Sequence, residues 1–78
     1  LLYDNKSVKA AEFLRRVRKV ARKKNIPCRF VPDRGKGSHG MLFYGDRRTT
    51  LKDLKKEIGE SLLHDMCRQL GIDKGDLF

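Results

Sequence analysis

Long hydrophobic runs are missing from this sequence. No stretch approaches the roughly 18 apolar residues that a membrane-spanning helix needs, so we expect no membrane-embedded function. Acidic side chains are also scarce, because 10 Asp and Glu stand against 19 Lys and Arg, a formal net charge of +9 on 78 residues. A field of this sign attracts polyanions, which means nucleic acid, an anionic membrane surface or an acidic protein partner.

Cysteine is scarce as well. Cys28 and Cys67 lie in different expected elements, which leaves one disulfide or two reduced thiols as alternatives. Two reduced, partly buried thiols in a cytosolic protein are the simpler interpretation. No spacing of cysteine and histidine matches a zinc site, so we expect neither a metal nor a cofactor.

The length allows one small domain, residues 1–78, with a core over about 8–72. Ser7 is a candidate helix cap. After it, an apolar stripe at helical spacing predicts a first helix that ends before Pro27. The stripe consists of Ala10, Phe13, Leu14, Val17, Val20 and Ala21, and the opposite face is basic.

Three short strands follow, over residues 28–31, 41–44 and 47–50. Gly45-Asp46 is a two-residue turn typical of a tight hairpin, so the last two strands should be antiparallel. Between the adjacent Phe43 and Tyr44, we expect Phe43 to face the core.

Helical chemistry returns near the C-terminus. Thr50 and Asp53 resemble a capping box, which predicts a short helical turn ending near Gly59. Leu62, Leu63, Met66 and Leu70 form the apolar stripe of a last helix, with Gly71 as its C-cap. Residues 73–78 are expected to be loose.

The predicted fold is therefore α+β, in the order α-β-β-β-α. A three-stranded antiparallel sheet with both helices on one face would bury the two apolar stripes together. This is the layout of double-stranded RNA-binding domains.

The loop GKGSHG, residues 35–40, joins the first two strands. It has a plain interpretation as a turn in which glycines relax the backbone. It can also be interpreted as a loop that binds phosphate and transfers a proton. Backbone N–H groups of a glycine-rich loop can bind an anion, with Arg34, Lys36, Gly37 and Ser38 adding charge and hydrogen bonds. Histidine has an ordinary pKa of about 6.5 and can move a proton near neutral pH, so His39 is the candidate acid or base for RNA cleavage by its own 2′-hydroxyl.

The run Lys36-Gly37-Ser38-His39 followed by Met41-Leu42-Phe43 resembles the signature loop of HicA toxins. The segment from Leu51 to Ile72 resembles the Leu-Lys segment and final helix of the same family, and the similarity spans about residues 8–72. The family's His-Pro element is replaced here by Arg47-Arg48-Thr49-Thr50, and the first helix is more basic than usual.

The resemblance implies a cytoplasmic mRNA interferase of a type II toxin–antitoxin system, with His39 catalytic. It also implies a HicB-like antitoxin partner that covers the His39 surface, and a double-stranded-RNA-binding-like fold.

Further cations are candidates for RNA phosphate contact: Arg15, Lys19 and Arg22 on the first helix, and Arg47 and Arg48 at the sheet edge. His64, on the last helix, is expected to be only a solvated residue. Three hypotheses follow: a metal-independent endoribonuclease, a non-catalytic RNA-binding module of the same fold, and a basic protein whose target is an acidic partner.

Overall fold

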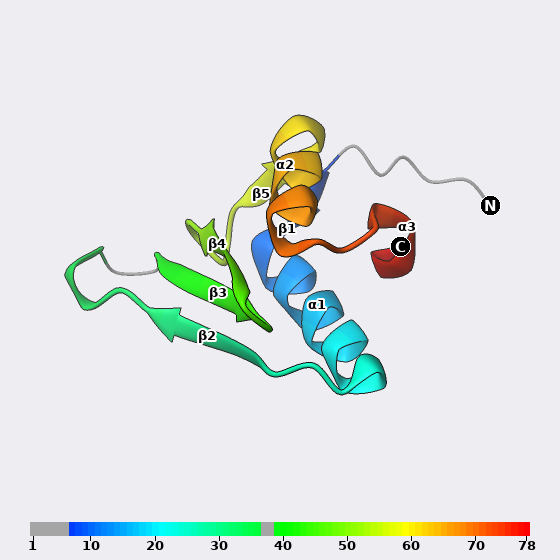
Figure 1. Ribbon diagram of the computed structural model, residues 1–78. Coiled ribbons are helices and arrows are strands. Elements are labelled where there is room, and N and C mark those ends of the chain that lie inside the picture. Colours follow the sequence, from blue (N-terminus) through cyan, green and yellow to red (C-terminus); the bar gives the residue numbers. More distant parts are fainter. Residues whose placement is uncertain (1–6, 37–38) are drawn as a thin grey trace.

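The computed structural model describes residues 7–36 and 39–78 (Figure 1). The sheet of β2, β3 and β4 is antiparallel in that order, and β1 pairs with β5 in a second, two-stranded sheet. The α+β class with a helix, three antiparallel strands and a helix is confirmed. The elements in chain order are β1 (Ser7–Lys9), α1 (Ala10–Lys24), β2 (Cys28–Pro32), the 3-10 turn η1 (Arg34–Lys36), β3 (Gly40–Tyr44), β4 (Arg47–Leu51), β5 (Glu57–Gly59), α2 (Glu60–Leu70) and α3 (Lys74–Leu77).

The two-residue turn between β3 and β4 sets the register of the sheet. Gly45 has φ of 63°, in the left-handed region that glycine adopts at low cost, and Tyr44 pairs with Arg47 across the turn. Counting back along both strands brings Gly40 opposite Leu51. The predicted hairpin is confirmed, and its register decides which residues lie beside the loop that follows β2.

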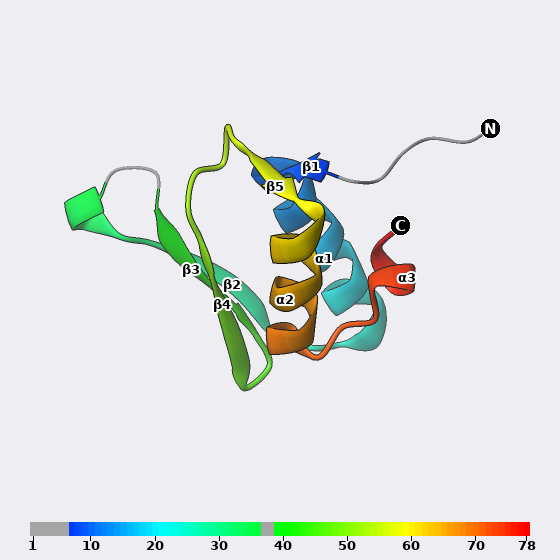
Figure 2. The same ribbon diagram turned by 90° about the horizontal axis from the view of Figure 1, so that it is seen from above.

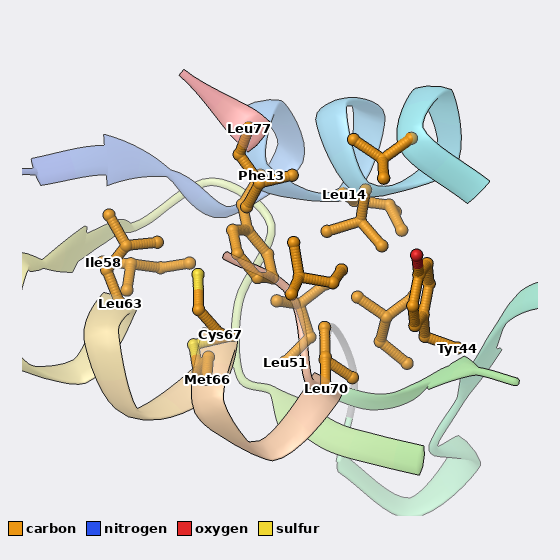
Figure 3. Close-up of a cluster of buried hydrophobic side chains, with 14 of the residues drawn as sticks. Phe13, Leu14, Tyr44, Leu51, Ile58, Leu63, Met66, Cys67, Leu70 and Leu77 are labelled. Carbon is orange, nitrogen blue, oxygen red and sulfur yellow. The ribbon is translucent and has the colours of Figure 1, made fainter. Parts of the chain in front are cut away.

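The helices α1 and α2 lie on one side of the three-stranded sheet (Figure 2). Phe13 of α1 is fully buried and reaches into the middle of the core, between α1 and α2 (Figure 3). From the sheet, Leu42 and Leu51 are also fully buried. The two apolar stripes and one sheet face therefore form a single core, as the amphipathic patterns predicted.

The prediction that Phe43 faces the core is wrong. Tyr44 is buried and Phe43 is only half-buried. Side chains alternate between the two faces of a strand, so Tyr44 shares the helix-facing side with Leu42, and Phe43 takes the opposite side. Both residues are aromatic and adjacent in the sequence, so the sequence does not show which of them is buried. The position of the helices decides this.

The predicted Ser7 cap is also wrong. The N-cap position of α1 is Lys9, which makes no side-chain cap, and the Ser7 hydroxyl donates instead to Glu57 Oε1 at 2.8 Å. The N–H of Ala10 donates to the Lys56 carbonyl at 2.9 Å, and that of Ala11 donates to the Leu54 carbonyl at 3.1 Å. Backbone carbonyls of the segment before β5 thus accept hydrogen bonds from the first N–H groups of α1, which have no partner within the helix.

The helical turn expected after Thr50 is a strand and a tight turn. Thr50 belongs to β4, and Asp53 accepts a hydrogen bond from the Lys55 N–H at 2.9 Å through its side chain. The Lys56 N–H donates to the Asp53 carbonyl at 3.0 Å, which closes the turn before β5. The Asp53 carboxylate therefore organises a turn in place of a helix cap.

The C-terminal residues are ordered, contrary to expectation. They form α3, and Asp73 caps it by accepting from the Gly75 N–H at 3.0 Å. Leu77 is only 4% exposed, so the core extends past residue 72. Gly71 ends α2 in the left-handed conformation, as predicted, but Leu62 is 45% exposed and does not belong to the buried stripe.

Within residues 7–36 and 39–78, no helix is long and apolar enough to span a bilayer.

Candidate active site

His39 lies at the end of the loop between β2 and β3, directly before the first residue of β3. The Asp33 N–H donates to the His39 carbonyl at 2.7 Å, which closes the loop at its base. Asp33 also accepts from the Gly35 N–H at 2.9 Å through its carboxylate, which organises the turn η1. The backbone of His39 is therefore held in place by the sheet and by Asp33.

Gly40 explains why a glycine follows the histidine. A Cβ at this position would lie 2.4 Å from Phe30 Cζ and 2.8 Å from the Val31 carbonyl oxygen. The Phe30 ring therefore packs directly on the Gly40 backbone. This contact anchors the first residue of β3 and, with it, the neighbouring His39.

The His39 side chain is half-buried and lines an open hollow at the end of the sheet. The other residues that line this hollow are Val31, Pro32, Asp33, Gly40, Met41 and Thr50. A polyanion can approach the imidazole here. Asp33 also lines this hollow, while its carboxylate accepts the Gly35 N–H within the loop.

Sequence reasoning did not identify Asp33 and Thr50 as neighbours of His39. A signal for Thr50 was present, because counting four pairs back from the Gly45-Asp46 turn brings Thr50 opposite Met41. Asp33 carries no such signal, because a single aspartate before a glycine indicates only a turn.

The phosphate-binding residues predicted within the loop are described only in part. Arg34 is exposed and lies in η1, on the same loop as His39. Gly37 and Ser38 lie outside the described residues, as does the side chain of Lys36.

The structure does not bring the α1 cations to His39. α1 packs on one face of the sheet, whereas η1 lies beyond the strand ends, at the opposite end of the molecule from α3 (Figures 1 and 2). Arg15 donates to both carboxylate oxygens of Glu12, with Nε 3.0 Å from Oε1, so its guanidinium is already paired. Lys19 and Arg22 are exposed on the same helix.

Arg47 and Arg48 are also separated from the loop and from each other. They lie at the turn end of β4, about 13 Å (Arg47) and about 10 Å (Arg48) along the strand from the Gly40–Leu51 pair that adjoins the loop. The Arg47 side chain lies over Gly71 at the end of α2, on the helix-covered face. Arg48 pairs with Phe43 on the open face. The two arginines therefore act on opposite sides of the sheet.

The two thiols are free and do not lie in the site. Burial raises the pKa of Cys28, opposed by the charge of Arg18, and burial likewise raises the pKa of Cys67, opposed by Lys74. A raised thiol pKa keeps the protonated, weakly nucleophilic form, so these are packing residues. In the part of the chain that the structure describes, no group of three or more His, Cys, Asp or Glu residues is arranged to hold a metal ion.

Comparison of the chain with protein-family models, with curated proteins and with solved structures found no match.

Proposed function

We propose that this protein is a metal-independent endoribonuclease of the HicA type, a cytoplasmic mRNA interferase that a HicB-like antitoxin neutralises. The single observation that carries the proposal is the position of His39. His39 is half-buried and lines an open hollow, and its backbone is held by Asp33 on one side and by the packing of Gly40 against Phe30 on the other. A proton carrier held in place and open to solvent is what general acid–base catalysis on a polymer needs.

In the proposed reaction, His39 accepts the proton of a 2′-hydroxyl as that oxygen attacks the adjacent phosphorus. The bond from phosphorus to the 5′-oxygen breaks, and water supplies a proton to the departing oxygen. The products are a 2′,3′-cyclic phosphate end and a 5′-hydroxyl end. Arg34, on the same loop, and the backbone N–H groups of the loop would stabilise the negative charge on the phosphate.

A cleavage assay tests this function. The chain and its His39→Ala variant are incubated with single-stranded RNA in EDTA, and the fragments and their ends are analysed. We expect cyclic-phosphate fragments from the parent and a rate lower by about 10²- to 10⁴-fold in the variant. His64→Ala is the matched control, because His64 is exposed on α2, and it should cleave at the parent rate.

RNA with a 2′-deoxy residue at the cut should resist cleavage at that position. Intact RNA with the parent chain, or equal cleavage by the parent and His39→Ala, would contradict the proposal.

A non-catalytic RNA-binding module of the same fold is the second candidate. It is favoured by the composition of the hollow, where His39 is the one histidine among the described lining residues. A single imidazole serves one of the two proton transfers and leaves the other to water. For this candidate, the same assay would show a gel shift without fragments.

A further inference from the structure

One face of the three-stranded sheet has no described helix packed on it. The register places two rows of side chains on this open face. The first row is Arg29, Phe43 and Arg48, and the second is Val31, Met41 and Thr50. Leu42 and Tyr44 alternate with Met41 and Phe43 along β3 and are buried in the core, whereas Phe43 and Met41 are only half-buried. Val31 is 40% exposed.

Phe43 lies at the centre of the first row, between two arginines. The Arg29 guanidinium carbon lies over the ring, 5.4 Å from its centroid, and Arg48 is the cross-strand partner on the other side. Nucleobases stack on aromatic rings and on guanidinium planes, and arginine also binds phosphate. The row combines these features on an accessible surface.

The second row leads from this aromatic residue to His39. Val31, Met41 and Thr50 line the same hollow as the imidazole. Along β3, Met41 is two residues, or about 7 Å, from Phe43, and His39 is two residues further. A strand of a few nucleotides lying along β3 therefore spans both Phe43 and His39.

We infer that this open face is the surface that binds the unpaired bases of the single-stranded RNA that reaches His39. The reason is that a duplex keeps its bases stacked inside and cannot present them to the Phe43 ring. The two rows contain two arginines and no acidic residue, which complements a polyanion. The relevance to cleavage rests on the proposed function, but the binding does not require it.

Binding is measured on the full chain carrying His39→Ala, so that the RNA stays intact. The probe is a fluorescent single-stranded RNA of about eight nucleotides, within the usual site size for such surfaces. Replacing Phe43 with Leu keeps an apolar side chain but removes the ring, and we expect roughly tenfold or weaker affinity. Phe78→Leu is the matched control, since Phe78 is also half-buried beneath an arginine, with the Arg16 guanidinium 4.8 Å from its ring centroid, but it lies in the α3 region. It should leave the affinity unchanged.

A duplex of the same length should bind more weakly than the single strand and should not respond to Phe43→Leu. Thermal unfolding checks that each variant folds. Should Phe43→Leu fail to fold, Arg48→Gln tests the same row with an exposed side chain and should also weaken single-strand binding. Unchanged single-strand affinity in the folded variant, or equal binding of the duplex, would overturn the inference. The same holds if these substitutions disturb only the binding of an acidic protein partner.

The two proposals fail separately. If the parent does not cleave RNA but single-strand binding depends on Phe43, the catalytic function fails and the binding face stands. If the parent cleaves RNA and Phe43→Leu with His39 intact cleaves at the same rate, the binding face fails and the catalytic function stands.

Discussion

His39 and Gly40 are neighbours with opposite requirements. In the proposed reaction His39 needs an accessible side chain, whereas Gly40 tolerates none, because the Phe30 ring occupies the space where its Cβ would be. The two roles are linked, since the packing at Gly40 fixes the start of β3 and thereby the direction of the histidine. The sequence suggests that Gly40 makes the loop flexible, whereas in the structure Gly40 allows the Phe30 ring to pack on the sheet backbone.

Gly40→Ala should destabilise the protein by about 1–3 kcal/mol, because the new methyl group forces Phe30 and the backbone at Val31 apart. Gly75→Ala is the control. Gly75 is exposed, has no positive φ, and a Cβ built there meets Asp73 Oδ1 at 3.6 Å, an ordinary contact, so its stability should not fall below that of the parent. Urea denaturation measures both. Equal stability of Gly40→Ala and the parent would show that the Phe30 contact does not constrain the loop.

Glu12 gives the protein a pH dependence at the residue scale. Hydrogen bonds from Arg15 and Arg16 lower the pKa of Glu12 from 4.5 to about 2, against a smaller opposing effect of desolvation. A carboxylate with a lowered pKa stabilises the fold above its unfolded-state pKa, and this contribution is lost as the pH falls from about 4.5 towards 2.

Glu12→Gln should therefore reduce the fall in Tm over that pH interval. Added salt should shrink the difference from the parent, because the pair is exposed and screened. Parallel Tm curves for the parent and variant across this interval would contradict the assignment.

At the scale of elements, α3 packs against α1 and holds the C-terminal residues there. The Arg16 guanidinium donates to the Leu77 carbonyl at 2.6 Å, Lys24 Nζ lies 3.5 Å from Asp76 Oδ2, and the Leu77 side chain enters the core. The ion pair is exposed and contributes little, so the buried leucine provides most of the stabilisation.

Leu77→Ala should lower the free energy of unfolding by about 2–4 kcal/mol, as for other buried leucines. Leu62→Ala makes the same chemical change at a side chain that is 45% exposed, and it should cost well under half as much. Urea denaturation of the two variants measures both losses in the free energy of unfolding. Similar losses for both would mean that α3 does not contribute to the core.

At the scale of the whole molecule, two basic surfaces lie apart from each other. His39 and the open sheet face lie on one side. On the other, between α1 and α3, a hollow of about 230 Å³ is lined by Arg15, Arg16, Lys19, Val20, Lys23, Lys24, Asp76 and Leu77. In Figure 2, α1 and α2 lie between the three-stranded sheet and α3. A short RNA on the sheet therefore does not reach the hollow, but a long one can fold around the protein.

Replacing Lys19 and Lys23 together with Gln should weaken the binding of long RNA and reduce its salt dependence by about 0.7 in slope for each phosphate that the protein no longer neutralises. Binding of an RNA of about eight nucleotides should change little. Lys55 and Lys56, replaced together with Gln, make the same change in net charge in the turn before β5. Equal losses of affinity in both double variants would show that total charge alone controls binding.

Much of the candidate site could be read from local sequence. The tight turn at Gly45-Asp46 needs only two residues, and the loop that carries His39 follows from the strands on either side. The residues that lie beside His39 were harder to predict from the sequence. Asp33 acts through hydrogen bonds within the loop. Thr50, eleven positions from His39 in the chain, reaches the hollow through its strand pairing with Met41.

By itself, the sequence determined the amphipathic helices, the three strands and the strong positive charge, because each depends on residues a few positions apart. Tertiary structure decided the rest. The pairing of Ser7–Lys9 with Glu57–Gly59, the burial of Leu77 and the choice of Tyr44 over Phe43 all depend on segments that are distant in the chain. The same long-range packing separates Arg47 from Arg48, since alternate residues of a strand face opposite sides and only the docked helices determine which side becomes the core.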